Sequence, residues 1–288
     1  MAYTAEISRA APVAFVFLLD QSASMQDRFG GSDARGDAAP SKAVVLAETV
    51  NRLLQALVLR CAKEDGVRDY FHVGVIGYGE RLQPLLVPAD DQPSVGGLVP
   101  LSHLAERPLR LDTRVRRVPD GQGGYAEQRR RIPVWFDPHA RGGTPMCEAL
   151  ALATDAVRTW GDAFPHAFPP VVLNVTDGEA TDGDPLRAAL RLRSYGTDDG
   201  EALLFNVHLS DSDAAPVAFP SSLAELPRGE PFARALYEMS STLPFSMRGA
   251  AEAEGLRPTP DTRGFVYNAD PAALVRLLEI GTRPAPLR

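Results

Sequence analysis

The stretch VAFVFLLDQSASM, residues 13–25, decides how the rest of the chain is organised. Its first part, residues 13–19, is apolar throughout, too short for a membrane span, and typical of a strand buried on both faces of a parallel sheet. Asp20, Ser22 and Ser24 alternate where this strand gives way to a loop, so their oxygen atoms can converge on one point. One carboxylate and two hydroxyls suit a hard cation such as Mg²⁺, which keeps several waters.

The composition is that of an ordinary soluble globular protein. The 288 residues are 44% hydrophobic and 23% charged, enough for one large α/β domain or two small ones. The net charge of −7 argues against general nucleic-acid binding, so no nucleic-acid partner is expected. We find no signal-peptide pattern at the N-terminus and no apolar run of bilayer length, and therefore expect a cytoplasmic protein without a membrane span.

The two cysteines, Cys61 and Cys147, lie in apolar helical patterns without metal-ligand spacing. This setting favours buried free thiols over a disulfide or a reactive site.

Apolar strand patterns alternate with helical patterns along the chain. We expect further strands at 70–78, 171–176, 202–209 and 264–268, and helices at 42–62, 146–159, 184–193 and 272–280. This alternation predicts an α/β fold with a doubly wound, mostly parallel sheet and helices on both faces. Since no repeat or linker divides the sequence, we expect a single domain over residues 1–288.

Two regions interrupt this regular pattern. Residues 79–141 predict an edge strand at 82–87 and a β-hairpin made of 109–118 and 129–136. Residues 210–263 are rich in proline and contain one clear helix, at 232–241. We interpret both regions as insertions that form partner-specific surfaces.

The hairpin region is rich in arginine, with nine arginines within residues 103–141. One interpretation is a solvated face whose charges protect an exposed edge from aggregation. The alternative is a basic surface that steers an acidic partner. The candidate partner-binding residues are Arg114, Arg116, Arg117 and Arg130.

Two more polar motifs stand where predicted elements begin or end. The sequence RGGTP, residues 141–145, allows a tight turn with Pro145 at the first position of a helix, which presents Thr144 at the helix start. Asp177 opens the sequence DGEATD directly after the predicted strand 171–176. In doubly wound sheets, ligands collect outside the carboxyl ends of the strands, so Asp20 and Asp177 can face each other there.

The three segments together resemble the metal-ion-dependent adhesion site (MIDAS) of the von Willebrand factor A (vWA), or integrin I-like, domain family, of the bacterial intracellular type. The resemblance implies a Rossmann-like vWA fold in which a Mg²⁺ or Mn²⁺ ion is bound. The ligands that it implies are Asp20, Ser22, Ser24, Thr144 and Asp177. It also implies that an Asp or Glu of a partner protein completes the coordination and that the chain is not an enzyme.

The sequence departs from the common family pattern at two positions. Ala23 stands where many members have Gly, and Gln21 stands where Thr is frequent. Neither change removes a ligand.

The sequence is compatible with three function classes. In the first, the chain is a metal-dependent protein-interaction module, since relatives of this type often act beside MoxR-type AAA+ ATPases or with kinases and phosphatases in stress-response assemblies resembling the tellurium-resistance system. The second is a Mg²⁺-dependent phosphoryl-transfer or hydrolytic enzyme. Against it, the sequence has no Walker-type loop, and Ser22 stands where a phosphatase would usually carry a second Asp. The third is a scaffold with an inactive metal site.

Overall fold

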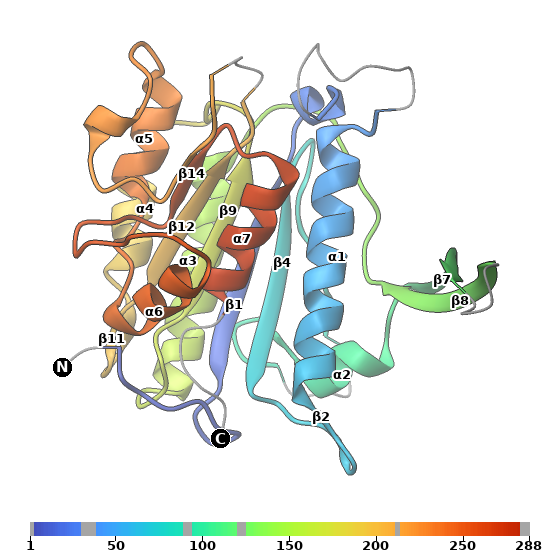
Figure 1. Ribbon diagram of the computed structural model, residues 1–288. Helices are drawn as coiled ribbons and strands as arrows, with labels where there is room; N and C mark the ends of the chain where they lie inside the picture. The colour runs from blue at the N-terminus through green and yellow to red at the C-terminus, as the bar shows by residue number, and fades with distance from the viewer. Residues whose placement is uncertain (1–2, 30–38, 89–93, 120–124, 211–213, 283–288) are drawn as a thin grey trace.

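The structure, a computed structural model, describes residues 3–29, 39–88, 94–119, 125–210 and 214–282. Its centre is one mixed sheet (Figure 1). From one edge to the other, its strands are β13 (Val217–Ala218), β14 (Phe265–Tyr267), β12 (Leu203–His208), β9 (Val171–Thr176), β1 (Val13–Gln21), β4 (Phe71–Gly79) and β5 (Leu82–Pro84), with β6 (Val99–Pro100) also paired to β4.

The order of the strands confirms the predicted doubly wound sheet. β1 pairs in parallel with β4 on one side and β9 on the other, and β9, β12 and β14 continue in parallel. β5, β6 and β13 are antiparallel additions at the edges. Because the chain passes from β1 to β4 and only later to β9, the strand order reverses at β1, where ligands collect in such sheets.

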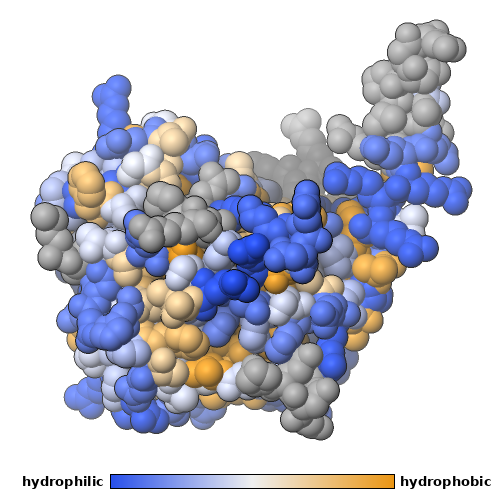
Figure 2. All heavy atoms as spheres, turned by 90° about the horizontal axis from the view of Figure 1, so that it is seen from below, coloured by the Kyte–Doolittle hydropathy of each residue, from blue (hydrophilic) through white to orange (hydrophobic). Residues whose placement is uncertain are grey.

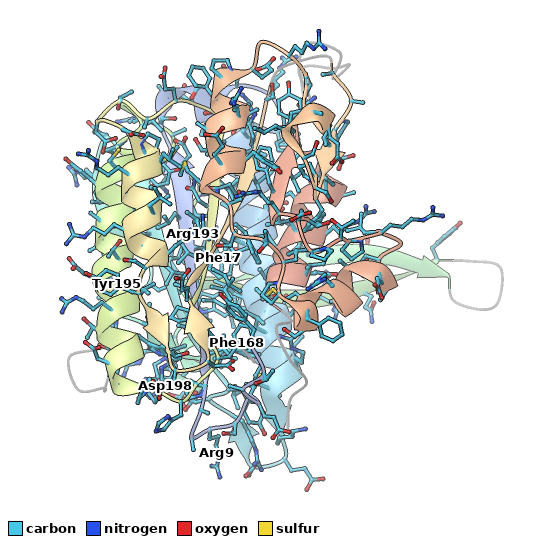
Figure 3. All side chains as sticks on the ribbon, turned by 90° about the vertical axis from the view of Figure 1, so that its left-hand side faces the viewer. Arg9, Phe17, Phe168, Arg193, Tyr195 and Asp198 are labelled. Atoms are coloured by element: carbon cyan, nitrogen blue, oxygen red, sulfur yellow. The ribbon has the colours of Figure 1, made fainter. Side chains whose placement is uncertain are left out.

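Helices cover both faces of the sheet (Figure 1). The helices whose buried residues share one hydrophobic core are α1 (Lys42–Cys61), α2 (Leu101–Glu106), α6 (Phe245–Ala253) and α7 (Pro271–Gly281). Those of the other core are α3 (Met146–Ala163), α4 (Pro185–Arg193) and α5 (Pro231–Met239). Successive residues of β1 alternate between the cores, as a strand requires: Phe17 belongs to the first and Leu18 to the second. Phe17 and Phe168 both lie inside the body, fully buried (Figure 3).

Local capping explains where several helices begin. Ser41 accepts a hydrogen bond from Val44 N at 3.3 Å, and Asp270 accepts one from Ala273 N at 2.6 Å. The predicted helix starts at these two positions are confirmed. Pro145 differs from the prediction, because it is the N-cap of α3 and lies just before the helix.

The two irregular regions contain more regular structure than the sequence predicted. The predicted edge strand 82–87 is shorter: β5 ends at Pro84, although Leu85 N still donates to the Val75 carbonyl at 2.7 Å. The helix predicted at 232–241 is confirmed as α5. A second helix, α6, follows it and was not predicted, because its small residues around Gly249 give only a weak apolar pattern.

Several short elements complete the described chain. The arginine-rich hairpin is confirmed as β7 (Arg110–Pro119) paired with β8 (Tyr125–Val134). Two small hairpins are β2 (Ala62–Lys63) with β3 (Gly66–Val67), and β10 (Gly196–Thr197) with β11 (Gly200–Glu201). The short 3-10 helices are η1 (Ala23–Gln26) and η2 (Leu223–Glu225).

Both cysteines are free thiols, with Cys61 buried and Cys147 half-buried. Among the helices in the described parts of the chain, none has an apolar stretch long enough to cross a bilayer.

Candidate metal site

Asp20 stands at the carboxyl end of β1, just before η1 in the chain. It is 1% exposed, and both of its carboxylate oxygens accept hydrogen bonds. Oδ1 accepts from Ser22 N at 2.8 Å, and Oδ2 accepts from the Thr176 hydroxyl at 2.6 Å. Burial raises the pKa of Asp20 to about 6, because the charged form loses hydration. The residue is therefore an oxygen donor that would gain from a nearby cation.

A chain of hydroxyl groups joins the first segment to Asp177. The Oγ atoms of Ser22 and Ser24 lie 3.1 Å apart, and the Ser24 hydroxyl donates to Asp177 Oδ1 at 2.7 Å. Asp177 follows β9, which is the direct neighbour of β1 in the sheet. The parallel pairing of these two strands thus brings residues 153 positions apart into hydrogen-bonding contact.

The Thr144 loop is tied to both of these segments. Thr144 N donates to the Thr181 hydroxyl at 3.0 Å, and Thr181 N donates to the Thr144 carbonyl at 3.0 Å. On the other side, Ala23 N donates to the carbonyl of Gly142 at 3.0 Å. A Cβ built on Gly178 would lie 3.7 Å from Thr144 Oγ1, which places the Thr144 hydroxyl beside the start of the third segment.

Glycine is required where the loop meets the strand ends. Gly142 has φ +84°, and a Cβ there would lie 2.5 Å from the backbone N of Glu80. A Cβ on Gly79 would lie 2.4 Å from the carbonyl oxygen of Gln21. The close approach of three backbones at this edge therefore depends on residues without side chains.

The donor set fits a hard divalent ion. The predicted ligands supply two carboxylates and three hydroxyls, all oxygen donors, from three segments that hydrogen bonds hold together. Within the described residues there is no group of three or more His, Cys, Asp or Glu arranged to hold a metal. Such a hydroxyl-rich site suits Mg²⁺ or Mn²⁺ better than a softer metal that prefers nitrogen or sulfur.

Sequence reasoning missed several residues of this site. Thr176 bonds Asp20, and a polar residue ending an apolar strand was the signal that could have found it. Asp182 caps α3 by accepting from Cys147 N at 3.1 Å and Glu148 N at 2.8 Å, which anchors the third segment to the helix that follows Thr144. The sequence places Lys42 at the start of a predicted helix, and in the structure its Nζ lies 3.0 Å from Asp177 Oδ2.

The predicted partner-binding arginines lie on the hairpin formed by β7 and β8, which we call the ribbon. The ribbon projects from the body beside α1 (Figure 1). In the view from below, the part of this projection that is coloured is mostly hydrophilic (Figure 2). Arg114 pairs with Glu48 of α1 at 2.6 Å, and Arg130 is exposed directly opposite Arg114 in the ladder. The side chains of Arg116 and Arg117 lie outside the described ones.

The chain is similar in structure to several known proteins. A von Willebrand factor type A structure from Catenulispora acidiphila is 15% identical with a TM-score of 0.44, over 95% of this chain and 43% of that one. The ArnB paralog VWA2 from Sulfolobus acidocaldarius is 12% identical with a TM-score of 0.35, over 69% and 35%. An aerotolerance-related membrane protein from Bacteroides fragilis is 16% identical with a TM-score of 0.41, over 94% and 99%.

The chain therefore spans less than half the length of the Catenulispora structure. No protein-family model and no curated protein sequence matches the chain.

Proposed function

We propose that this chain is a non-enzymatic, metal-dependent protein-interaction module that binds an acidic residue of a partner through a Mg²⁺ or Mn²⁺ ion. The ion would be held by Asp20, Ser22, Ser24, Thr144 and Asp177. One observation supports this most: three distant segments, each predicted as part of a metal site, are tied together by hydrogen bonds at the carboxyl edge of the sheet. This convergence is what an oxygen-donor ion site requires.

The chain's own residues would give the site two different sides. Asp20 and Ser22 are buried, and Thr144 is 6% exposed, so they form the protein side of the site. Ser24 and the neighbouring Gly143 are exposed, so a partner's side chain can approach from the solvent side. When bound, the ion would supply a positive charge that attracts a partner's carboxylate.

The contacts of Ser22 place it in the oxygen network of the candidate site. Its Oγ lies 3.1 Å from the Ser24 hydroxyl, and its side chain also hydrogen-bonds the Asp20 carboxylate, as a ligand of the same ion would. An enzyme that transfers phosphoryl groups and a scaffold with an inactive site remain the alternatives. Each predicts a different result in the experiment below.

The proposal is tested with Asp20→Ala, compared with Asp162→Ala as a control. Asp162 is exposed near the far end of α3, so both variants lose one negative charge but only Asp20→Ala loses a ligand. Mg²⁺ or Mn²⁺ should raise the melting temperature of the control as in the wild type, and should leave Asp20→Ala unchanged. Pull-downs with Asp20→Ala should likewise fail to recover the partner, whereas the control should recover it as the wild type does.

The alternatives give distinguishable outcomes. Equal partner recovery with Asp20→Ala would support the scaffold. Turnover of a phosphate ester that disappears in both Asp20→Ala and Ser22→Ala would support the enzyme. For the partner itself, we propose an AAA+ ATPase of the MoxR type, a kinase or a phosphatase in a stress-response assembly, and proteins that co-purify with the wild type but not with Asp20→Ala would identify it.

The ribbon is the second part of this proposal, as a basic surface that steers an acidic partner. Strand alternation gives it two faces. Arg114 and Arg130 lie on the face that α1 holds through Glu48, whereas Arg129 and Arg131 share the other face with Leu111 and Val115. Leu111 and Val115 are 52% and 53% exposed, so this outer face offers both charge and apolar area.

The two faces can be tested separately. Arg129→Ser with Arg131→Ser should slow association with the partner and flatten its dependence on salt, because exposed charges act mainly on the association rate. Arg114→Ser with Arg130→Ser is the matched control on the other face and should have a smaller effect. If both double variants associate with the partner at the wild-type rate, the arginines would serve only to keep the exposed hairpin soluble.

A further inference from the structure

Lys42 is a buried lysine placed among the oxygen atoms of the candidate metal site. It is the first residue of α1 and 2% exposed. Its Nζ lies 3.0 Å from Asp177 Oδ2, and the side chain of Asp177 is 1% exposed. Since Asp177 Oδ1 accepts from Ser24, both carboxylate oxygens of this predicted ligand already have a donor from the protein.

Lysine is rare in this chain, so its presence at position 42 is unusual. Only two of the 30 lysine and arginine residues are lysines, Lys42 and Lys63, and Lys63 is exposed. An ammonium group is a compact point charge, whereas a guanidinium is a wide planar fork. A lysine therefore fits beside a small oxygen cluster as an inorganic cation would.

The charges of the site give this lysine a consequence for ion binding. Asp20 and Asp177 bring two negative charges, and Lys42 returns one positive charge in a buried setting where charges interact strongly. The carboxylate of Asp177 is thus balanced by the chain itself. A divalent ion entering next to Lys42 would be repelled by its positive charge.

We propose that Lys42 is a built-in counter-cation of the site: it holds Asp177 in place without a divalent ion and lowers the affinity of the site for one. This inference rests on the proposed function, because it specifies how the same site is regulated. An ion would bind tightly only when a further negative group balances the charge, and the acidic residue of the partner is such a group. Lys42 thereby couples ion binding to partner binding.

The test compares Lys42→Gln and Lys42→Met with Lys63→Gln, which removes the other lysine from an exposed position. Mg²⁺ and Mn²⁺ are titrated calorimetrically into each protein, and melting temperatures are recorded in EDTA and in excess Mg²⁺. Both Lys42 variants should bind the ions about tenfold more tightly than the wild type, as removal of a nearby positive charge predicts. Lys63→Gln should bind as the wild type does.

Stability provides a second readout that separates this role from packing. In EDTA the Lys42 variants should melt below the wild type, and excess Mg²⁺ should narrow or reverse that difference. If Lys42 only fills space, its replacement would lower the melting temperature by the same amount in EDTA and in excess Mg²⁺. Lys42→Gln keeps an amide that can donate to Asp177, so it carries the comparison if Lys42→Met does not fold.

The possible failures are distinct. Equal ion affinity in the wild type and the Lys42 variants would overturn the role of Lys42 and leave the metal site standing. No calorimetric or thermal response to either ion in any of the proteins would overturn the metal site, and the inference with it.

Discussion

Charged groups at the carboxyl edge of the sheet and on the ribbon have opposite surroundings. At the sheet edge, the side chains of Lys42 and Asp177 are 2% and 1% exposed and lie 3.0 Å apart. On the ribbon, the side chains of Arg114 and Glu48 are 51% and 43% exposed and lie 2.6 Å apart. The shorter contact is therefore the more hydrated one.

The distance between two charges does not by itself determine how much an ion pair contributes to stability. Exposed pairs contribute little because water and salt screen them. A buried pair depends on both partners, since removal of one leaves a charge in a poorly hydrated place. We therefore expect the sheet edge to govern stability and ion binding, and the ribbon to govern association rates.

The largest expected effect is at the buried pair. Asp177→Asn in EDTA removes a buried carboxylate that lies 3.0 Å from Lys42 Nζ and should lower the free energy of unfolding by about 3 to 5 kcal/mol. Urea denaturation of the wild type and the variant measures this difference. A loss below about 1 kcal/mol would contradict the contrast between the two regions.

An intermediate effect, which depends on pH, is expected for Asp20→Asn in EDTA. Burial raises the pKa of folded Asp20 to about 6 from an ordinary value of 3.8, so the stabilisation linked to its proton is present below about pH 4 and is lost as the pH rises through 6. Relative to the wild type, the variant should therefore gain about 2 to 3 kcal/mol between pH 4 and pH 8.

Urea denaturation across this pH range measures the gain. Asp162→Asn, which is exposed, controls for the loss of one negative charge. If the free energies of unfolding of Asp20→Asn and the wild type differ by the same amount from pH 4 to pH 8, Asp20 does not titrate as its burial predicts.

The smallest effect is expected at the exposed pair. Glu48→Gln removes one partner of the contact between α1 and the ribbon and should change the free energy of unfolding by less than about 0.5 kcal/mol. The change should vanish at high salt. A loss comparable to that of Asp177→Asn would mean that the ribbon contributes to the core stability of the fold.

The order of helices and strands could be predicted because the signals are local. Apolar strands such as 13–19 and 171–176 and helix caps such as Ser41 and Asp270 can be recognised within a few residues of sequence. The prediction failed where such signals are weak. α2 has six residues, too few to show a helical period, and α6 is built largely from small residues.

The sequence by itself determined the doubly wound sheet and the three segments that end at its carboxyl edge, because apolar periodicity and the parallel direction of the strands fix which ends meet. Only the tertiary structure decided that the Thr176 hydroxyl bonds Asp20 and that Lys42 lies against Asp177, 135 residues away. It also decided which face of the ribbon Glu48 holds. These contacts depend on how helices and strands pack against one another, and no local pattern of residues specifies that packing.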